Sequence, residues 1–142
     1  MKNLRIWSLL CLIWMGVLAA SAQDTGKEKI SLGDAMPAIT LSSEIYGKVT
    51  PADLKGKVVL VSLFATWCGP CKKSMQSMVP LKKNLSSKDI VYIYLTGPSS
   101  PENIWKSNLS KMTGVHYRLT DSQWKYLCTS YGVTGIPAYL II

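Results

Sequence analysis

The chain has 142 residues, a length typical of a single domain, and 48% of them are hydrophobic, which is enough to build a core. Its 16 basic and 8 acidic residues give a formal charge of +8, but the lysines are scattered and form no basic stripe interleaved with aromatic residues. This distribution argues against nucleic-acid binding. It leaves acidic partners or a membrane surface as the simpler explanation of the positive charge.

The N-terminal segment has the features of a secretory signal peptide. A positively charged start precedes an apolar run over residues 6–20, and the small residues at 20–22 fit a cleavage site. We expect a cleaved leader over 1–22 and one domain over 23–142. The alternative is an uncleaved N-terminal anchor, although the apolar run is short for a spanning helix of about 20 residues. In either form we expect the domain in the periplasm or cell envelope, where disulfides can form.

The predicted elements alternate between strands and helices. Residues 37–57 carry turn signals that favour a short hairpin. The continuous apolar run at 58–64 is typical of a strand buried on both faces of a parallel sheet. A helix is expected to begin at Gly69-Pro70, because proline in the first turn loses no hydrogen bond. Pro80 is expected to kink that helix, since it removes one backbone donor.

The pattern continues with a strand at 90–95 and a helix at 101–112. Ser99 followed by Glu102 resembles a capping box, which would place the start of that helix between them. Trp105 is expected on the buried side of this helix, where apolar residues recur at helical spacing.

The last elements are a strand at 115–119, a helix and a strand at 138–142. Side chains alternate along 115–119, which predicts that His116 faces solvent. Thr120 is expected to cap the helix that follows, and Gly132 to end it. Strands alternating with helices predict an α/β fold with a largely parallel central sheet flanked by helices.

The cysteines are the candidate reactive residues of this sequence. Three remain after the leader, and an odd count argues against a purely structural set of disulfides. Cys68 precedes the first turn of the predicted helix, where unpaired N–H groups and the helix dipole favour a thiolate. Cys71 lies one turn further along. The spacing predicts a two-step exchange without a cofactor, in which Cys68 attacks a partner's disulfide and Cys71 resolves the mixed disulfide.

Two other roles for this cysteine pair stay open, a structural disulfide and a metal site. A metal site would recruit His116 and Cys128 as further ligands, but their distant spacing is unlike that of metal sites, and we expect no metal. Cys128 lies on the apolar stripe of its helix, which favours a small core residue. Its alternative role is that of a resolving or regulatory thiol.

Two motifs make the sequence similar to a known family. The segment VVLVSLFATWCGPCKK resembles the active-site segment of thioredoxin-like proteins, and YGVTGIPAYLII is similar to their later signature. The leader, the GDAMPAITL lead-in and the insertion around 97–119 resemble the TlpA-type thiol–disulfide oxidoreductases of the bacterial envelope. The resemblance covers roughly 33–142 and implies a thioredoxin-like fold. It also implies that Pro137 is cis and faces both cysteines.

The resemblance further implies a substrate surface and a class of partners. The backbone of Ile136 would pair with the partner's extended peptide, and Trp67 would shield one side of the cysteines. We expect reduction of protein disulfides, with disulfide-containing envelope proteins or cytochrome apoproteins as partners and a membrane protein as electron donor. A non-catalytic binding module that uses the groove near Pro137 is the alternative. The expected substrate-binding residues are Trp67, Gly69, Pro70, Ile136 and Pro137.

The sequence departs from the family pattern at three places. Ser62 and Ser74 stand where relatives often carry an acid that accepts the proton of the second cysteine, which leaves water, Lys72 or Lys73 to tune the thiols. Proline, usual five residues after the second cysteine, is replaced by Gln76.

The third departure is the end of the chain. The family fold continues past this point with an antiparallel strand and a C-terminal helix. We therefore expect a C-terminally incomplete domain of marginal stability.

Overall fold

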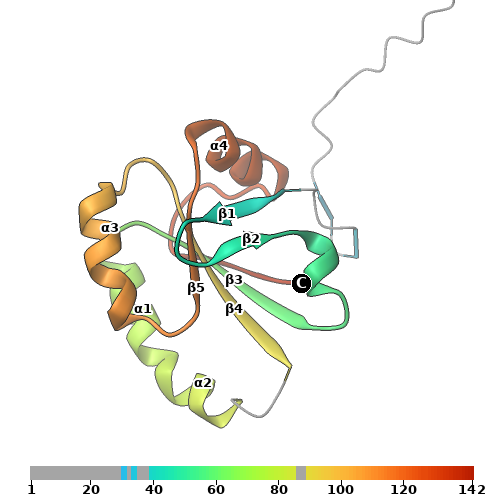
Figure 1. The fold of residues 1–142 in the computed structure, drawn as a ribbon, viewed down its shortest axis with the longest axis horizontal. Coiled ribbons are helices and arrows are strands. Elements are labelled where there is room, and N and C mark those ends of the chain that lie inside the picture. Colours follow the sequence, from blue (N-terminus) through green and yellow to red (C-terminus); the bar gives the residue numbers. More distant parts are fainter. Residues whose placement is uncertain (1–29, 32, 35–38, 86–88) are drawn as a thin grey trace, which may run out of the picture.

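The computed structural model describes residues 30–31, 33–34, 39–85 and 89–142. They form a four-stranded sheet with helices on both faces and a separate two-stranded hairpin (Figure 1). The predicted leader over 1–22 lies outside the described residues. Within the described ranges, no helix combines the length and apolar character needed to cross a membrane.

The central sheet has the strand order β5-β4-β3-β6. Three strands are mutually parallel, β3 (Val58–Phe64), β4 (Ile90–Thr96) and β5 (Val115–Arg118). The fourth, β6 (Ala138–Ile141), pairs antiparallel with β3. The predicted strands are confirmed to within one residue at each end, and so is the largely parallel character of the sheet.

One face of the sheet is covered by the hairpin and by α4 (Asp121–Ser130). The hairpin pairs β1 (Leu41–Ser43) with β2 (Gly47–Val49), as predicted, and a 3-10 turn, η1 (Pro51–Leu54), leads on to β3. Apolar side chains from these elements and the sheet form the larger core cluster. Its buried members are Ile39, Leu41, Val59, Val61, Leu63, Ile93, Leu95, Tyr117, Leu119 and Leu127.

The opposite face is covered by the helices that precede and follow β4. The first begins at the predicted residue and is divided into α1 (Gly69–Ser77) and α2 (Val79–Asn84), with Met78 between them. Pro80 occupies the first turn of α2, so the predicted kink is a complete break. The buried members of the second core cluster are Phe64, Ala65, Cys68, Cys71, Met75, Tyr94 and Trp105.

The helix after β4 differs from the prediction of 101–112. It consists of α3 (Glu102–Asn108) and a 3-10 turn, η2 (Leu109–Lys111). The predicted capping box with Ser99 is wrong, because the N-cap of α3 is Pro101, two residues later, and the proline side chain has no hydrogen-bond acceptor. Trp105 is buried, as expected.

The two ends of α4 agree with the sequence. The Thr120 hydroxyl accepts a hydrogen bond from the backbone N–H of Gln123, and the Gln123 side chain accepts from the backbone N–H of Thr120. Gly132 follows the helix with a φ of 62°, a conformation that glycine adopts without strain.

The prediction that His116 faces solvent is wrong. Its side chain is fully buried, and its ring stacks on Tyr94 with centroids 4.6 Å apart. A ring nitrogen, Nε2, lies 3.1 Å from the carbonyl oxygen of Met112, in the segment that leads from η2 to β5. Alternation fails as a guide here because this segment covers the second face of the strand. Burial lowers the pKa of His116, which keeps the imidazole neutral at neutral pH.

Candidate active site

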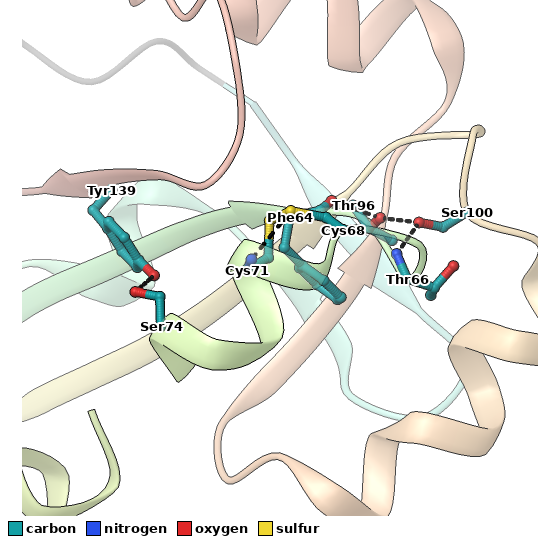
Figure 2. Close-up of a disulfide and its surroundings, with 8 residues drawn as sticks. All are labelled: Phe64, Thr66, Cys68, Cys71, Ser74, Thr96, Ser100 and Tyr139. Atoms are coloured by element: carbon teal, nitrogen blue, oxygen red, sulfur yellow. Dashed lines mark hydrogen bonds between the residues drawn. A yellow bond between two sulfur atoms is a disulfide. The ribbon is translucent and has the colours of Figure 1, made fainter. Parts of the chain in front are cut away.

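Cys68 and Cys71 are joined by a disulfide at the N-terminus of α1 (Figure 2). Their Cα atoms are 5.3 Å apart, and Cys68 Sγ accepts a hydrogen bond of 3.2 Å from the backbone N–H of Cys71. Cys71 is fully buried, and Cys68 is 4% exposed. The structure thus brings together the two cysteines singled out by the sequence. Their separate roles as nucleophile and resolving thiol stay predictions.

The position of Cys68 as the N-cap of α1 has an electrostatic consequence. The first turn of a helix presents unpaired N–H groups and the positive end of the helix dipole. Sγ of Cys68 already accepts one such N–H, and the first turn contains no acidic side chain. Both features favour a negative charge on this sulfur over one on Cys71, whose sulfur lies inside the helix-sheet interface.

Buried hydroxyl groups hold the loop between β3 and the cysteines (Figure 2). The Ser100 hydroxyl accepts a 2.9 Å hydrogen bond from the backbone N–H of Thr66 and lies 2.6 Å from the hydroxyl of Thr96. Thr96 in turn donates to the carbonyl oxygen of Phe64 at 2.9 Å. Arg118 donates to the carbonyl oxygen of Ser100 from the other side. The loop that carries the cysteines is therefore tied to the ends of β4 and β5.

Replacing Ser100 with alanine is expected to lower the free energy of unfolding by about 1–3 kcal/mol, because the buried N–H of Thr66 loses its acceptor. Urea denaturation of the oxidised protein measures the change. Ser99→Ala is the matched control, since Ser99 is exposed and should shift the midpoint little. Equal shifts for the two variants would mean that the network does not hold the loop.

A transverse row of polar side chains crosses the sheet beneath α1. Ser62 in β3 is paired in register with Tyr94 in β4 and with Tyr139 in β6, and Tyr94 is paired with His116 in β5. Ser62, Tyr94 and His116 are buried. Burial raises the pKa of Tyr94 to about 12 and lowers that of His116, so neither ring is charged at neutral pH. The buried part of the transverse row therefore consists of hydroxyl groups and a neutral imidazole, and it carries no charge.

The outer end of the transverse row reaches α1. The Tyr139 hydroxyl donates a hydrogen bond of 2.6 Å to Ser74 Oγ, one helical turn beyond Cys71 (Figure 2). Lys72 and Lys73, the charged candidates for tuning the cysteines, are both exposed. Sequence reasoning did not find Tyr139, since its contact with Ser74 depends on the pairing of β6 with β3. The signal available was Ser74 itself, a hydroxyl at a position where the family resemblance implied an acid.

The residues expected to contact a substrate surround the cysteines. Trp67 is 64% exposed, and Gly69 and Pro70 are exposed beside it. The bond between Ile136 and Pro137 is cis, as the resemblance implied. Ile136 packs against the cluster that contains both cysteines, whereas Pro137 is exposed. The structure therefore brings these residues to one site, and their contact with a partner stays a prediction.

The third cysteine lies away from this site. Cys128 is a free, half-buried thiol that packs against the larger core cluster, and burial raises its pKa. This placement agrees with a core role. His116 stacks on Tyr94, on the face of the sheet that α1 covers, whereas Cys128 packs on the other face. The two side chains therefore cannot share one metal ion with the cysteine pair. Among the described residues, no three His, Cys, Asp or Glu side chains are grouped in a way that could hold a metal.

Comparisons with known proteins extend these observations. The family model described as Redoxin matches residues 31–142. The thiol-disulfide oxidoreductase ResA of Bacillus subtilis (strain 168) is 29% identical over 140 residues, covering 98% of this chain and 77% of that protein. ResA of Bacillus thuringiensis (strain Al Hakam) is 28% identical over 116 residues, covering 82% of this chain and 66% of that protein.

A solved structure shows the same fold. The thioredoxin domain of a thiol-disulfide oxidoreductase from Bacteroides vulgatus superposes with a TM-score of 0.69 at 23% identity, covering 80% of this chain and 82% of that one. The strand order, the cysteine pair at the start of α1 and the family match agree with one another. The chain therefore belongs to the Redoxin family, among the thioredoxin-like thiol–disulfide oxidoreductases.

Proposed function

We propose that this chain reduces protein disulfides in the bacterial envelope, with Cys68 as the nucleophile and Cys71 as the resolving thiol. The observation that carries the proposal is the placement of Cys68 as the N-cap of α1, disulfide-bonded to the buried Cys71. The Gly-Pro pair between the cysteines resembles that of reducing thioredoxins, which supports reduction as the direction.

The exchange starts from the dithiol form. The Cys68 thiolate attacks one sulfur of the partner's disulfide, which forms a mixed disulfide and releases the other sulfur as a thiolate that takes up a proton. Cys71 then loses its proton and attacks Cys68 Sγ. This second step restores the disulfide seen here and releases the partner as a dithiol. Two electrons and two protons pass to the partner, and an external thiol donor must return the chain to its reduced form.

The partners follow from the same site. A protein disulfide in an extended segment would lie across Trp67, Gly69 and Pro70 on one side and the Ile136–Pro137 bond on the other. We propose disulfide-containing envelope proteins, cytochrome apoproteins among them, as the partners, and a membrane protein as the electron donor. The N-terminal segment over 1–22 is the proposed export signal, with an uncleaved anchor as its alternative.

Equilibration with glutathione tests the direction of the reaction. We expect a reduction potential near that of thioredoxin, about −270 mV, so that glutathione leaves the pair largely oxidised. The ratio of dithiol to disulfide forms can be read by alkylation and mass spectrometry across a series of glutathione ratios. A potential near about −120 mV, the oxidising end of the thioredoxin-like range, would refute the assignment as a reductase.

Reduction of insulin with dithiothreitol as donor tests whether the chain turns over at all. Precipitation of the freed insulin B chain should be faster with the wild-type chain than with dithiothreitol alone. No acceleration would favour the alternative, a non-catalytic module that only binds near Pro137.

A further inference from the structure

A pocket of about 600 Å³ lies beside α1 and α2 and is separate from the residues expected to contact a substrate. Its walls include Met75 and Val79 from these helices and Met112 from the segment after η2, and its floor includes Phe64 and Tyr94 from the sheet. The pocket begins at the end of β3, in the loop residues that lead directly into Trp67 and the cysteines. An apolar side chain of a partner protein could therefore bind in this pocket, within a few residues of the cysteine pair.

The rim of this pocket is strongly basic. Four lysines line it, Lys72, Lys82, Lys83 and Lys111, and none of the described residues that line it is acidic. A pocket with apolar walls and only positive charges at its rim attracts an occupant that is partly apolar and negatively charged.

Lys82 is the member of this set that is built into the pocket. Its ammonium group donates hydrogen bonds to the hydroxyl of Tyr94 and to the carbonyl oxygen of Thr113, and it lies 4.6 Å and 4.5 Å from the ring centroids of Tyr92 and Tyr94. None of the described carboxylates is within ion-pair distance of it. Partial burial lowers the pKa of Lys82, so an anion in the pocket would interact with a cation that is already partly desolvated.

The pocket and the cis proline lie on opposite sides of the redox pair. The pocket floor spans β3 and β4, whereas Pro137 leads into β6, on the other side of β3. A partner chain that presents its disulfide to Cys68 can therefore contact the cis proline on one flank and the pocket on the other.

We propose that this pocket binds an acidic segment of the partner protein, in which an apolar side chain is flanked by Asp or Glu, close to the disulfide being reduced. The apolar side chain would fill the space between α1, α2 and the sheet, and the carboxylates would pair with the lysines of the rim. This inference rests on the proposed function and adds a substrate class to it. The pocket selects among disulfides by the charge of the chain beside them.

Synthetic peptides with one internal disulfide test the proposal. The peptides differ only in the three-residue segment next to the disulfide, which is Glu-Leu-Glu, Gln-Leu-Gln or Lys-Leu-Lys. Each segment is tested in two versions, before and after the disulfide. Reduction by the full chain, with dithiothreitol as donor, is followed by mass spectrometry to obtain kcat/KM. At low ionic strength we expect the acidic peptide to exceed the neutral one about tenfold in kcat/KM, with most of the difference in KM. The preference should shrink as salt is added.

Variants locate the preference on the protein. Lys82→Gln and Lys111→Gln should each reduce the ratio of kcat/KM for the acidic peptide to that for the neutral peptide about threefold. The ratio is compared within each variant, which removes any general loss of activity. Lys111 is exposed, so its variant remains informative if Lys82→Gln fails to fold. Lys125→Gln is the matched control, because Lys125 is an exposed lysine of α4, on the opposite face of the sheet, and it should leave the ratio unchanged.

The outcomes separate this inference from the proposed function. Equal kcat/KM for the acidic and neutral peptides would overturn the inference and leave the reductase intact. The same holds for a preference that only Lys125→Gln reduces. No reduction of any peptide, nor of the neutral reagent 2,2′-dithiodipyridine, would instead refute the proposed function. Binding to phosphatidylglycerol vesicles that is lost in Lys82→Gln and Lys111→Gln, with no peptide preference, would make the pocket a membrane contact and overturn its assignment to a partner protein.

Discussion

Replacing Cys68 with serine is expected to lower the catalysed part of insulin reduction by about a thousandfold or more, which leaves only the background rate given by dithiothreitol alone. A serine hydroxyl does not ionise at neutral pH and cannot form a disulfide. Cys71 cannot take over the attack, because its side chain is fully buried between α1 and the sheet. The turbidity assay with equal amounts of wild type and variant measures the loss.

Cys71→Ser separates the two steps. Cys68 can still attack, but no thiol is left to resolve the product, so a mixed disulfide with insulin should accumulate. Non-reducing electrophoresis and intact-mass measurement detect it. Cys128→Ser is the matched control, since Cys128 lies on the opposite face of the sheet and should leave turnover and trapping unchanged. Trapping through Cys71 in the Cys68→Ser variant would reverse the two roles.

The largest expected effect on stability comes from Leu63→Ala. Leu63 is fully buried in β3, between β4 and β6, and belongs to the larger core cluster. Truncating a buried leucine removes its transfer free energy and leaves a cavity that the neighbours only partly fill. We expect a loss of about 3 kcal/mol in the free energy of unfolding. Against a usual total of about 5–15 kcal/mol, that loss would bring a marginally stable domain close to unfolding.

Urea denaturation of the oxidised protein measures this loss with the disulfide held constant. Leu81→Ala is the matched control, because Leu81 in α2 is 50% exposed and its truncation should change the stability by about 0.5 kcal/mol or less. Similar midpoints for both variants would show that the described core does not dominate the stability of the chain.

The elements and the cysteine pair were predictable because their signals are local. The apolar run at 58–64 and the proline after Cys68 each determine a structure within a few residues, and β3 and α1 begin where these signals place them. The break at Pro80 is local for the same reason: a proline inside a helical pattern removes its own hydrogen bond.

The features that the sequence did not reveal depend on pairing between distant strands. His116 is buried because β5 lies beside Tyr94 and beneath the segment at Met112, contacts that alternation within one strand cannot show. The contact of Tyr139 with Ser74 requires the antiparallel register of β6 on β3. The cis bond before Pro137 came from the resemblance alone, because most bonds to proline are trans.

The antiparallel pairing of β6 also bears on how the chain is made. β3 leads into the loop and helix that carry the cysteines. Its partners in β6 follow much later in the chain, 75 positions on for Leu63 and Ala138 and 81 for Leu60 and Ile141. At a synthesis rate of about 5–20 residues per second, the ribosome needs roughly 4–16 s to supply them. During that interval β3 has one edge unpaired, and the Ile136–Pro137 bond is not yet beside the cysteines. The nascent chain thus exposes its cysteines before the segment that is proposed to contact their partners has been made, which is a reason for chaperones to protect it.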